Sequence, residues 1–187
     1  MQGDRTQRLP DTPVEIRPIG PGDSVAELTD LLHRAYASLA AMGFCYVATH
    51  QSEQVTRERI AAGECYVAVT NDGAKLIGTV TLRRSSPDDG TPWYRRPGVC
   101  VFGQFAVDPA WQGRGVGSRL LETVERRAVA LGATEIALDT AEGATHLIDL
   151  YARRGYRFIE HVRWTSVNYR SVVMSKQLAA ANPESGL

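Results

Sequence analysis

One stretch in the middle of the chain limits what it can fold into: an apolar run, a glycine-rich segment and an amphipathic segment follow one another. The apolar run covers residues 99–107 and stops at Asp108-Pro109, which predicts a buried strand that ends in a turn. Residues 116–131 carry apolar side chains at helical spacing with charged side chains between them, which predicts a helix. Between strand and helix lies the sequence Gln112-Gly113-Arg114-Gly115-Val116-Gly117.

A strand, a glycine-rich loop and a helix in this order are typical of an anion-binding site. Free backbone N–H groups of the loop and the positive end of the helix dipole converge on one point, and phosphate is the anion we expect there. Gly113, Gly115 and Gly117 could instead serve only a tight turn and a close helix contact. Arg114 adds a charge suited to phosphate, although an arginine in a loop is often simply solvated.

Two families of phosphate-binding loops fit this spacing poorly. A P-loop needs a lysine directly after its last glycine, and none follows here. A dinucleotide-binding loop needs a third glycine where Ser118 stands, and it begins closer to its strand than residues 108–112 allow. Asp139, at the end of a later predicted strand, only imitates the acidic residue that would bind a ribose.

The pattern Q/R-x-x-G-x-G/A fits without adjustment, with Gln112, Gly115 and Gly117 at its fixed positions. Here the chain resembles the GCN5-related N-acetyltransferase (GNAT) family, in which this loop holds the pyrophosphate of acetyl-coenzyme A (acetyl-CoA). A second family motif, Y-x-x-x-G-[FY], is matched by residues 151–156. The resemblance covers residues 14–178 and implies an α/β fold. It would be a single GNAT domain, with a mixed twisted sheet, helices on both faces and a splayed pair of central parallel strands.

Length and composition agree with one such domain. The chain has 187 residues and no net charge, so charge gives no argument for nucleic acid or an anionic membrane as a partner. We expect a folded domain over residues 13–178 between mobile tails at 1–12 and 179–187. No apolar run reaches the roughly 20 residues of a membrane helix, and the first residues are too polar for a signal peptide. Cys45, Cys65 and Cys100 are predicted to be buried, reduced thiols, and the protein is expected in the cytoplasm.

The rest of the chain alternates between strand and helix patterns. Ser24 is the predicted N-cap of the first helix, and Asn71-Asp72-Gly73 is the predicted turn of an antiparallel hairpin. Residues 85–98 form a loop whose Trp93 and Tyr94 either line a substrate wall or cover the core. The predicted elements are an edge strand at 14–18, helices at 24–41 and 52–62, strands at 64–70 and 75–84, a strand at 134–140 parallel to 99–107, a helix at 143–154 and a terminal hairpin of strands 157–164 and 169–176.

The resemblance also implies a donor site for acetyl-CoA, with no metal. The loop would bind the pyrophosphate through backbone N–H groups, and the end of the preceding strand would pair with the pantetheine arm. A backbone N–H of that strand would lie near the thioester oxygen. The expected donor-binding residues are Phe105, Ala106, Val107, Gln112, Gly113, Arg114, Gly115, Val116, Gly117 and Ser118.

Tyr151 is the candidate acid that protonates the leaving thiolate, on the basis of the resemblance. A phenol with a pKa of about 10 is a weaker acid than a thiol with a pKa of about 8.5, so its help is modest without tuning. A tyrosine on the apolar face of a helix can equally be an ordinary core residue.

The base and the acceptor contacts stay open. Gln104 stands where many relatives carry glutamate, and an amide can bind or orient a water but cannot accept a proton at neutral pH. Each of the other candidates could also be a solvated, core or helix-terminal side chain. The candidate acceptor-side residues are Tyr46, Thr49, His50, Gln104, Glu142 and His146.

The predicted activity is acetyl transfer from acetyl-CoA to an amine by direct attack in a ternary complex. The acceptor could be a small amine, a polyamine, an amino acid or a protein N-terminus, and the lack of an acidic cluster argues against aminoglycoside-like polycations. Gln104, and an alanine at 144 where relatives often have asparagine, motivate an alternative: a non-catalytic acyl-CoA sensor with the same fold. The exposed edge of the terminal hairpin makes a homodimer a further expectation.

Overall fold

The computed structural model describes residues 14–71, 73 and 75–179. The tail expected at 1–12, Asp72 of the predicted turn, and the tail expected at 179–187 apart from Ala179 lie outside these residues. Within the described ranges the elements are β1 (Val14–Pro18), α1 (Val25–Ala41), η1 (Val47–Thr49), α2 (Glu53–Ala61), β2 (Glu64–Thr70), β3 (Leu76–Arg84), η2 (Trp93–Arg95), β4 (Val99–Val107), η3 (Pro109–Trp111), α3 (Val116–Ala130), β5 (Glu135–Ala141), α4 (Thr145–Arg153), β6 (Arg157–Arg163) and β7 (Arg170–Gln177).

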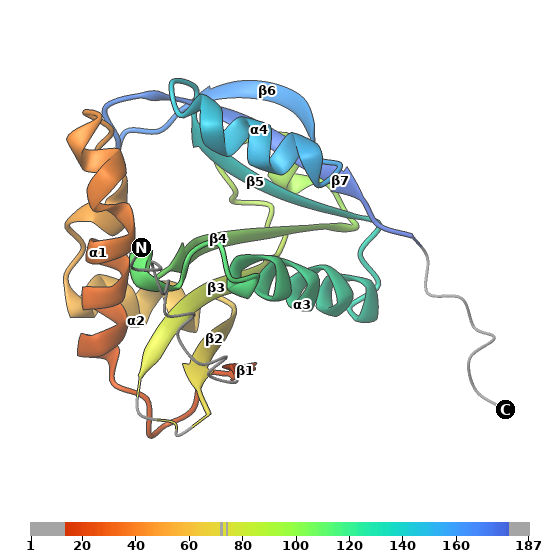
Figure 1. Ribbon diagram of the computed structural model, residues 1–187. Helices are drawn as coiled ribbons and strands as arrows, with labels where there is room; N and C mark the ends of the chain where they lie inside the picture. Colours follow the sequence, from red (N-terminus) through yellow and green to blue (C-terminus); the bar gives the residue numbers. More distant parts are fainter. Residues whose placement is uncertain (1–13, 72, 74, 180–187) are drawn as a thin grey trace, which may run out of the picture.

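The strands form one mixed sheet in the order β1-β2-β3-β4-β5-β7-β6 (Figure 1). Every neighbouring pair is antiparallel except β4 and β5, which are parallel and joined through α3, as predicted. The strand at 14–18 lies at the sheet edge, and the terminal hairpin forms with β6 at the opposite edge. The predicted strand bounds agree with the observed ones to within one residue, because alternating or continuous apolar patterns are local signals.

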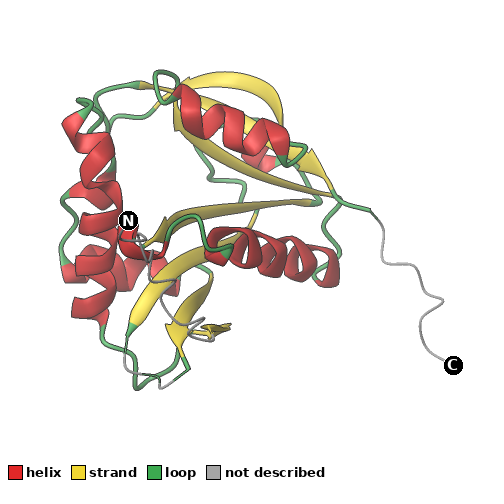
Figure 2. Cartoon of the chain, viewed as in Figure 1, coloured by secondary structure: helices red, strands yellow, loops and turns green. Residues whose placement is uncertain are grey.

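Helices cover both faces of the sheet, which confirms the predicted fold class (Figure 2). On one face α1 packs its buried leucines against β2 and β3, and Ser24 caps it by accepting a hydrogen bond from the Glu27 N–H at 3.2 Å. On the other face α3 and α4 pack over the middle of the sheet. The largest side chains of these two core layers include Leu28, Leu31, Leu32, Ile77, Leu82, Leu120, Leu121 and Ile136.

The predicted helix at 143–154 begins two residues later, at Thr145. The chain at Gly143 passes so close to the Phe44 ring that a Cβ there would lie 2.5 Å from the ring Cζ atom. This close approach belongs to the turn between β5 and α4, so residue 143 is part of the turn and not of the helix.

The parallel strands β4 and β5 separate soon after they meet. Their pairing covers only Val99–Val101 opposite Glu135–Ala137, although the two strands have 9 and 7 residues. Figure 1 shows them diverging toward α1. The splayed central pair is therefore confirmed, and in the part of the chain that the structure describes the edge of β4 that faces β5 has no strand partner beyond Val101.

A β-bulge lies in β4 at the start of this divergence. Thr79 pairs with Ala106 and Thr81 pairs with Gly103, so β4 has one residue more than β3 between the two pairs. Gln104 has a φ of 49°, which among the described residues makes it the one non-glycine residue in left-handed space. The bulge explains why the apolar run of this strand is interrupted at residues 103 and 104.

The loop at 85–98 covers the core instead of lining a substrate wall. Tyr94 is 2% exposed and packs with Val99, Val101, Ala137 and Val173, on the part of the sheet where β4, β5 and β7 lie. Trp93 packs against the same cluster. Between the two interpretations given for this loop, core cover is the one observed.

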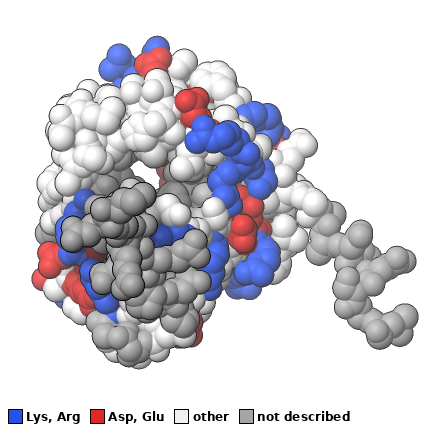
Figure 3. Space-filling view, in the orientation of Figure 1, with Lys and Arg blue, Asp and Glu red and all other residues white. Residues whose placement is uncertain are grey.

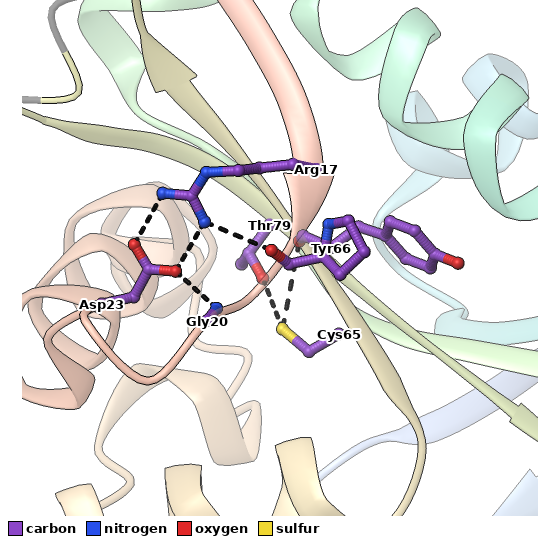
Figure 4. A network of polar contacts seen from close by, with 7 residues as sticks. Arg17, Gly20, Asp23, Cys65, Tyr66 and Thr79 are labelled. Carbon is purple, nitrogen blue, oxygen red and sulfur yellow. Dashed lines mark hydrogen bonds and ion pairs between the residues drawn. The ribbon is translucent and has the colours of Figure 1, made fainter.

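The end of β1 is tied to the turn before α1 by a charged contact (Figure 4). Arg17 donates to both carboxylate oxygens of Asp23 at 2.7 and 2.8 Å, and the Gly20 N–H donates to the same carboxylate at 2.7 Å. The hydrogen bonds from Arg17 lower the pKa of Asp23.

Figure 4 also shows the Cys65 thiol against Thr79, in the layer between the sheet and α1. Burial is confirmed for Cys65 and Cys100 and is wrong for Cys45, which lies exposed in the connection after α1. No helix in the described part of the chain has both the length and the apolar character needed to cross a membrane.

Candidate active site

Two cavities meet where β4 and β5 diverge. The larger cavity has a volume of about 770 Å³ and the smaller one about 240 Å³. Both are bounded by residues of α1, the connection after it, the two diverging strands and α4. The residues that line both cavities are Tyr36, Tyr46, Phe105, Asp139 and Tyr151.

The larger cavity runs along the end of β4, the glycine-rich loop and the start of α3. It collects eight of the ten residues expected to bind the donor: Phe105, Ala106, Val107, Gln112, Gly113, Gly115, Gly117 and Ser118. The other two side chains point elsewhere. Arg114 lies over the Trp111 ring, 5.0 Å from its centre, and Val116 is 2% exposed in the core.

The loop has the backbone shape that an anion site needs. Gly113 and Gly115 have φ angles of 72° and 80°, and Gly115 is the N-cap of α3. The first backbone N–H groups of a helix have no acceptor within it, so those of α3 are free to bind a ligand at this end of the cavity. Gln112 fixes the loop to the strand, since its Nε2 donates to the Val107 carbonyl at 3.2 Å.

Arg154 of the second motif forms hydrogen bonds with the same end of α3. Its guanidinium donates to the Ser118 hydroxyl at 3.0 Å and to the Ser118 carbonyl at 3.3 Å. Arg153 and His146 also line the larger cavity. Figure 3 shows Lys and Arg side chains gathered on the side of the molecule that carries α3 and α4. Residues 153 and 154 are variable positions of the Y-x-x-x-G-[FY] motif, so the motif alone did not predict this role.

Tyr151 lies at the junction of the two cavities. The residue is 6% exposed, and its ring packs 6.1 Å from that of Phe102 and 5.8 Å from that of Tyr156. Burial raises the pKa of the phenol well above 10. Tyr151 is therefore a neutral phenol that belongs to the core and also borders both cavities.

The smaller cavity has an aromatic wall. Tyr46 packs 5.3 Å from the Tyr36 ring and 4.8 Å from the Tyr169 ring. The Tyr46 hydroxyl lies 2.8 Å from Thr140 Oγ1 and accepts from the Ala141 N–H at 2.9 Å, so it bonds to the carboxyl end of β5. The Tyr36 hydroxyl donates to the Phe105 carbonyl at 3.1 Å, on β4. Together the two tyrosines bridge the diverging strands.

The candidate acceptor residues are not all brought together. Tyr46 and Gln104 line the smaller cavity, whereas His146 lines the larger one. Thr49 and His50 line neither cavity, and their side chains bond to each other at 3.0 Å. Glu142 is an exposed side chain paired with Arg170 and His161.

Two charged residues of the smaller cavity were missed from the sequence: Arg59 on α2 and Asp139 on β5. An acidic residue inside a predicted buried strand was a signal for Asp139. Its carboxylate is held by Tyr94, which donates to Oδ1 at 3.2 Å, and by Trp164, which donates to Oδ2 at 2.9 Å. Within the described ranges, no group of three His, Cys, Asp or Glu residues is arranged to hold a metal ion.

Comparisons with known proteins show the family to which the chain belongs. The model of the acetyltransferase (GNAT) family matches residues 26–156. Two similar proteins come from Bacillus subtilis (strain 168). S-(2-succino)cysteine N-acetyltransferase is 33% identical over 135 residues, 70% of this chain and 76% of that protein. S-alkylcysteine N-acetyltransferase is 32% identical over 137 residues, 72% of this chain and 74% of that protein.

Solved structures show the same fold. The ribosomal-protein-S18-alanine N-acetyltransferase from Escherichia coli matches with a TM-score of 0.67 and 16% identity, covering 93% of this chain and 99% of that one. A GNAT acetyltransferase from Elizabethkingia anophelis with acetyl-CoA bound matches with a TM-score of 0.61 and 20% identity, covering 90% and 99%. The chain belongs to the GNAT acetyltransferase family and is an acyltransferase of the GNAT type.

Proposed function

We propose that the protein transfers the acetyl group of acetyl-CoA to the primary amine of a small-molecule acceptor, with both substrates bound at once. The observation that carries this proposal is the meeting of two cavities at Phe105 and Tyr151. A donor in the larger cavity and an acceptor in the smaller one would approach each other there. The names of the two Bacillus subtilis relatives support a small acceptor such as an S-substituted cysteine.

The residues of the larger cavity fit acetyl-CoA. The left-handed Gly113 and Gly115 and the first N–H groups of α3 suit the pyrophosphate, and Arg153 and Arg154 add positive charge beside it. The unpaired edge of β4 beyond Val101 offers backbone groups to the amides of the pantetheine arm. The coenzyme supplies the acetyl group as a reactive thioester, and the protein supplies its position.

Catalysis would rest on positioning and on two proton-bearing groups. A backbone N–H in the stretch Phe105–Val107 would stabilise the negative charge that develops on the thioester oxygen. The Tyr151 hydroxyl, which keeps its proton at neutral pH, would give that proton to the leaving sulfur, and the proton that the attacking nitrogen loses would return the phenol to its neutral form. None of the three cysteines lines either cavity, which supports direct attack by the amine over transfer through an enzyme thiol.

The test is release of free coenzyme A thiol from acetyl-CoA in the presence of S-methyl-L-cysteine. We expect turnover, with the N-acetylated product identified by mass spectrometry. Thermal unfolding with coenzyme A alone tests donor binding independently of turnover. A ligand at about 100 times its dissociation constant stabilises the protein by roughly 2.7 kcal/mol. Stabilisation by coenzyme A without turnover of any amine in a broad panel would favour the acyl-CoA sensor instead. Absence of both would refute the proposal.

A further inference from the structure

The smaller cavity contains a guanidinium without an acidic partner. Arg59 is partly buried on α2, and burial lowers its pKa because the charged form loses hydration. Among the described residues, no Asp or Glu forms an ion pair with it, and Nη1 donates to Gln51 Oε1 at 2.7 Å. A partly desolvated charge without a counter-ion is costly, and an anionic ligand bound in the cavity would offset that cost.

Gly103 keeps this guanidinium open to the cavity. Gly103 lies on β4 directly before the bulge, and a Cβ at this position would point toward Arg59, 4.0 Å from Nη2. A side chain there would therefore occupy the space in front of the guanidinium. Its absence leaves room for part of a ligand.

The polarity of the hydrogen bonds beside Arg59 is fixed by Arg59 itself. A guanidinium can only donate, so the amide oxygen of Gln51 must face it, and the Gln51 NH₂ group must face the other way. Gln51 Nε2 donates to Gln104 Oε1 at 3.1 Å and to Thr56 Oγ1 at 2.7 Å. The Gln104 oxygen is thereby committed, and its own NH₂ group has to point away from this chain of bonds.

That NH₂ group has no acceptor within the described residues. Gln104 is 4% exposed, and its Nε2 atom is buried without a hydrogen-bond partner, in a residue that also has an unfavourable φ of 49°. Leaving a buried donor unsatisfied costs about 1 to 3 kcal/mol, so a bound acceptor atom would recover stability at this point. Arg59 and Gln104 line the same cavity, and both supply donors.

The negative charge of the cavity lies elsewhere. Asp139 borders the smaller cavity and also the larger one, where the acetyl group would arrive. It interacts electrostatically with Arg59 without forming an ion pair with it. Tyr94 and Trp164 each use one of its oxygens, which leaves each oxygen a further lone pair. A ligand with a negative and a positive end would match this separation of charges.

We propose that Arg59 and the Gln104 NH₂ group form a subsite for the carboxylate of an acceptor whose amine lies toward Asp139, so that the acceptor is an α-amino acid. This proposal rests on the proposed function, which supplies the amine acceptor, and it adds the residues that recognise the rest of the molecule. Carboxylate recognition by a guanidinium fork and an amide donor is geometrically specific.

The test compares two acceptors that differ only in the carboxylate: S-methyl-L-cysteine and 2-(methylthio)ethylamine. For the wild-type protein we expect kcat/KM to favour the amino acid by about 100-fold or more, since a site built to bind a polar group rejects the analogue without it. Arg59→Gln should lower kcat/KM for the amino acid by about 100-fold and for the amine by less than about threefold. Arg59→Lys keeps the charge and loses the planar fork of donors. Its kcat/KM for the amino acid should lie between the values of wild type and Arg59→Gln.

Two further variants sharpen the comparison. Gln104→Glu keeps the shape of the side chain but replaces the free donor by a negative charge, so it should lower kcat/KM for the amino acid relative to that for the amine by about 100-fold. Arg57→Gln is the matched control, because Arg57 lies on the same helix with 56% of its side chain exposed, and its one ion pair within the described ranges is with Glu53. It should leave both reactions unchanged. Thermal unfolding of each variant checks that it folds.

Binding gives a readout that does not need turnover. Calorimetric titration of S-methyl-L-cysteine into the protein saturated with coenzyme A should show binding that Arg59→Gln weakens by about 100-fold. If the wild-type protein acetylates amines but prefers 2-(methylthio)ethylamine, or if Arg59→Gln binds the amino acid as well as wild type does, the carboxylate subsite is refuted while acetyl transfer stands. If no amine is acetylated, the proposed function fails. The subsite then stands or falls on the titration.

Discussion

Burial affects Tyr151 in two opposite ways: it keeps the proton on the phenol and it weakens the phenol as an acid. Its burial penalises the phenolate, so the pKa lies well above the usual value of about 10 and the hydroxyl keeps its proton throughout the neutral range. The same shift makes it a poorer acid toward a thiolate. The contribution of Tyr151 should therefore come from holding a proton at the junction of the two cavities rather than from acid strength.

Tyr151→Phe removes the hydroxyl and keeps the ring between Phe102 and Tyr156. We expect kcat to fall by about 100-fold, within the usual range for the loss of a general acid. The unfolding free energy should change by less than about 1 kcal/mol, because the packing of the ring is retained. The measurement is kcat at saturating substrates from pH 6.5 to 9.5, together with thermal unfolding. Undiminished turnover at every pH would exclude the acid role.

The strand, loop and helix around Gly115 work as one element. β4 brings its free edge to the cavity, the two left-handed glycines turn the chain, and α3 presents its first N–H groups. Each part depends on a local property of the sequence, namely an apolar run, glycine or helical spacing. The position of the loop relative to the cavity therefore depends on backbone angles that only glycine adopts without strain.

Gly115→Ala should weaken coenzyme A binding, and Gly132→Ala is its matched control. Both glycines have a φ of 80°, both have open space where a Cβ would be, and they lie at opposite ends of α3. Each substitution should lower the unfolding free energy by about 1 kcal/mol through backbone strain. Only Gly115→Ala should raise the coenzyme A dissociation constant, by about tenfold, in a calorimetric titration. Equal affinities in the two variants would contradict a role of the loop in donor binding.

The difference between local signals and contacts between distant segments explains what the sequence could and could not predict. The glycine loop, Ser24 as an N-cap and every strand were predictable because neighbouring residues carry the signal. The bulge at Gln104 and the approach of Arg59 to β4 were not, because both depend on contacts between segments far apart in the chain. Asp139 is visible in the sequence as an acidic residue at the end of a strand. Its place at the junction of the two cavities follows only from the divergence of β4 and β5.

At the scale of the whole molecule, the site lies where the sheet has a short strand pairing, between β4 and β5. β1–β4 and β5–β7 meet through a parallel pairing that covers three residues of each strand. Tyr36 bonds to β4 and Tyr46 bonds to β5, so the helix and connection that precede α2 close the gap that the strands leave. The two cavities share lining residues at this gap, and under the proposed function the coenzyme would occupy the larger cavity and the acceptor the smaller one.

Stability against acid is also a property of the whole chain. The net charge is zero at neutral pH, so the overall self-repulsion of the fold is small there. The dependence on pH then comes from individual carboxyl groups. Hydrogen bonds from Arg17 lower the pKa of Asp23, and hydrogen bonds from Arg127 lower the pKa of Glu64. A group with a lowered folded-state pKa stabilises the protein above its unfolded pKa, about 3.9 for Asp, and loses this effect as the pH falls through the folded value.

Asp23→Asn tests this expectation. The variant keeps the turn before α1 but loses the charged contact with Arg17 at 2.7 Å, so its unfolding free energy at pH 7 should be lower than that of wild type by about 2 kcal/mol. The difference should narrow as the pH falls below about 3.9, because wild type then protonates Asp23 and loses the same contact. Asp30→Asn, an exposed change on α1, should follow wild type at every pH. The measurement is urea unfolding between pH 3 and 7. A difference that stays constant over this range would mean that Asp23 acts through packing and not through its charge.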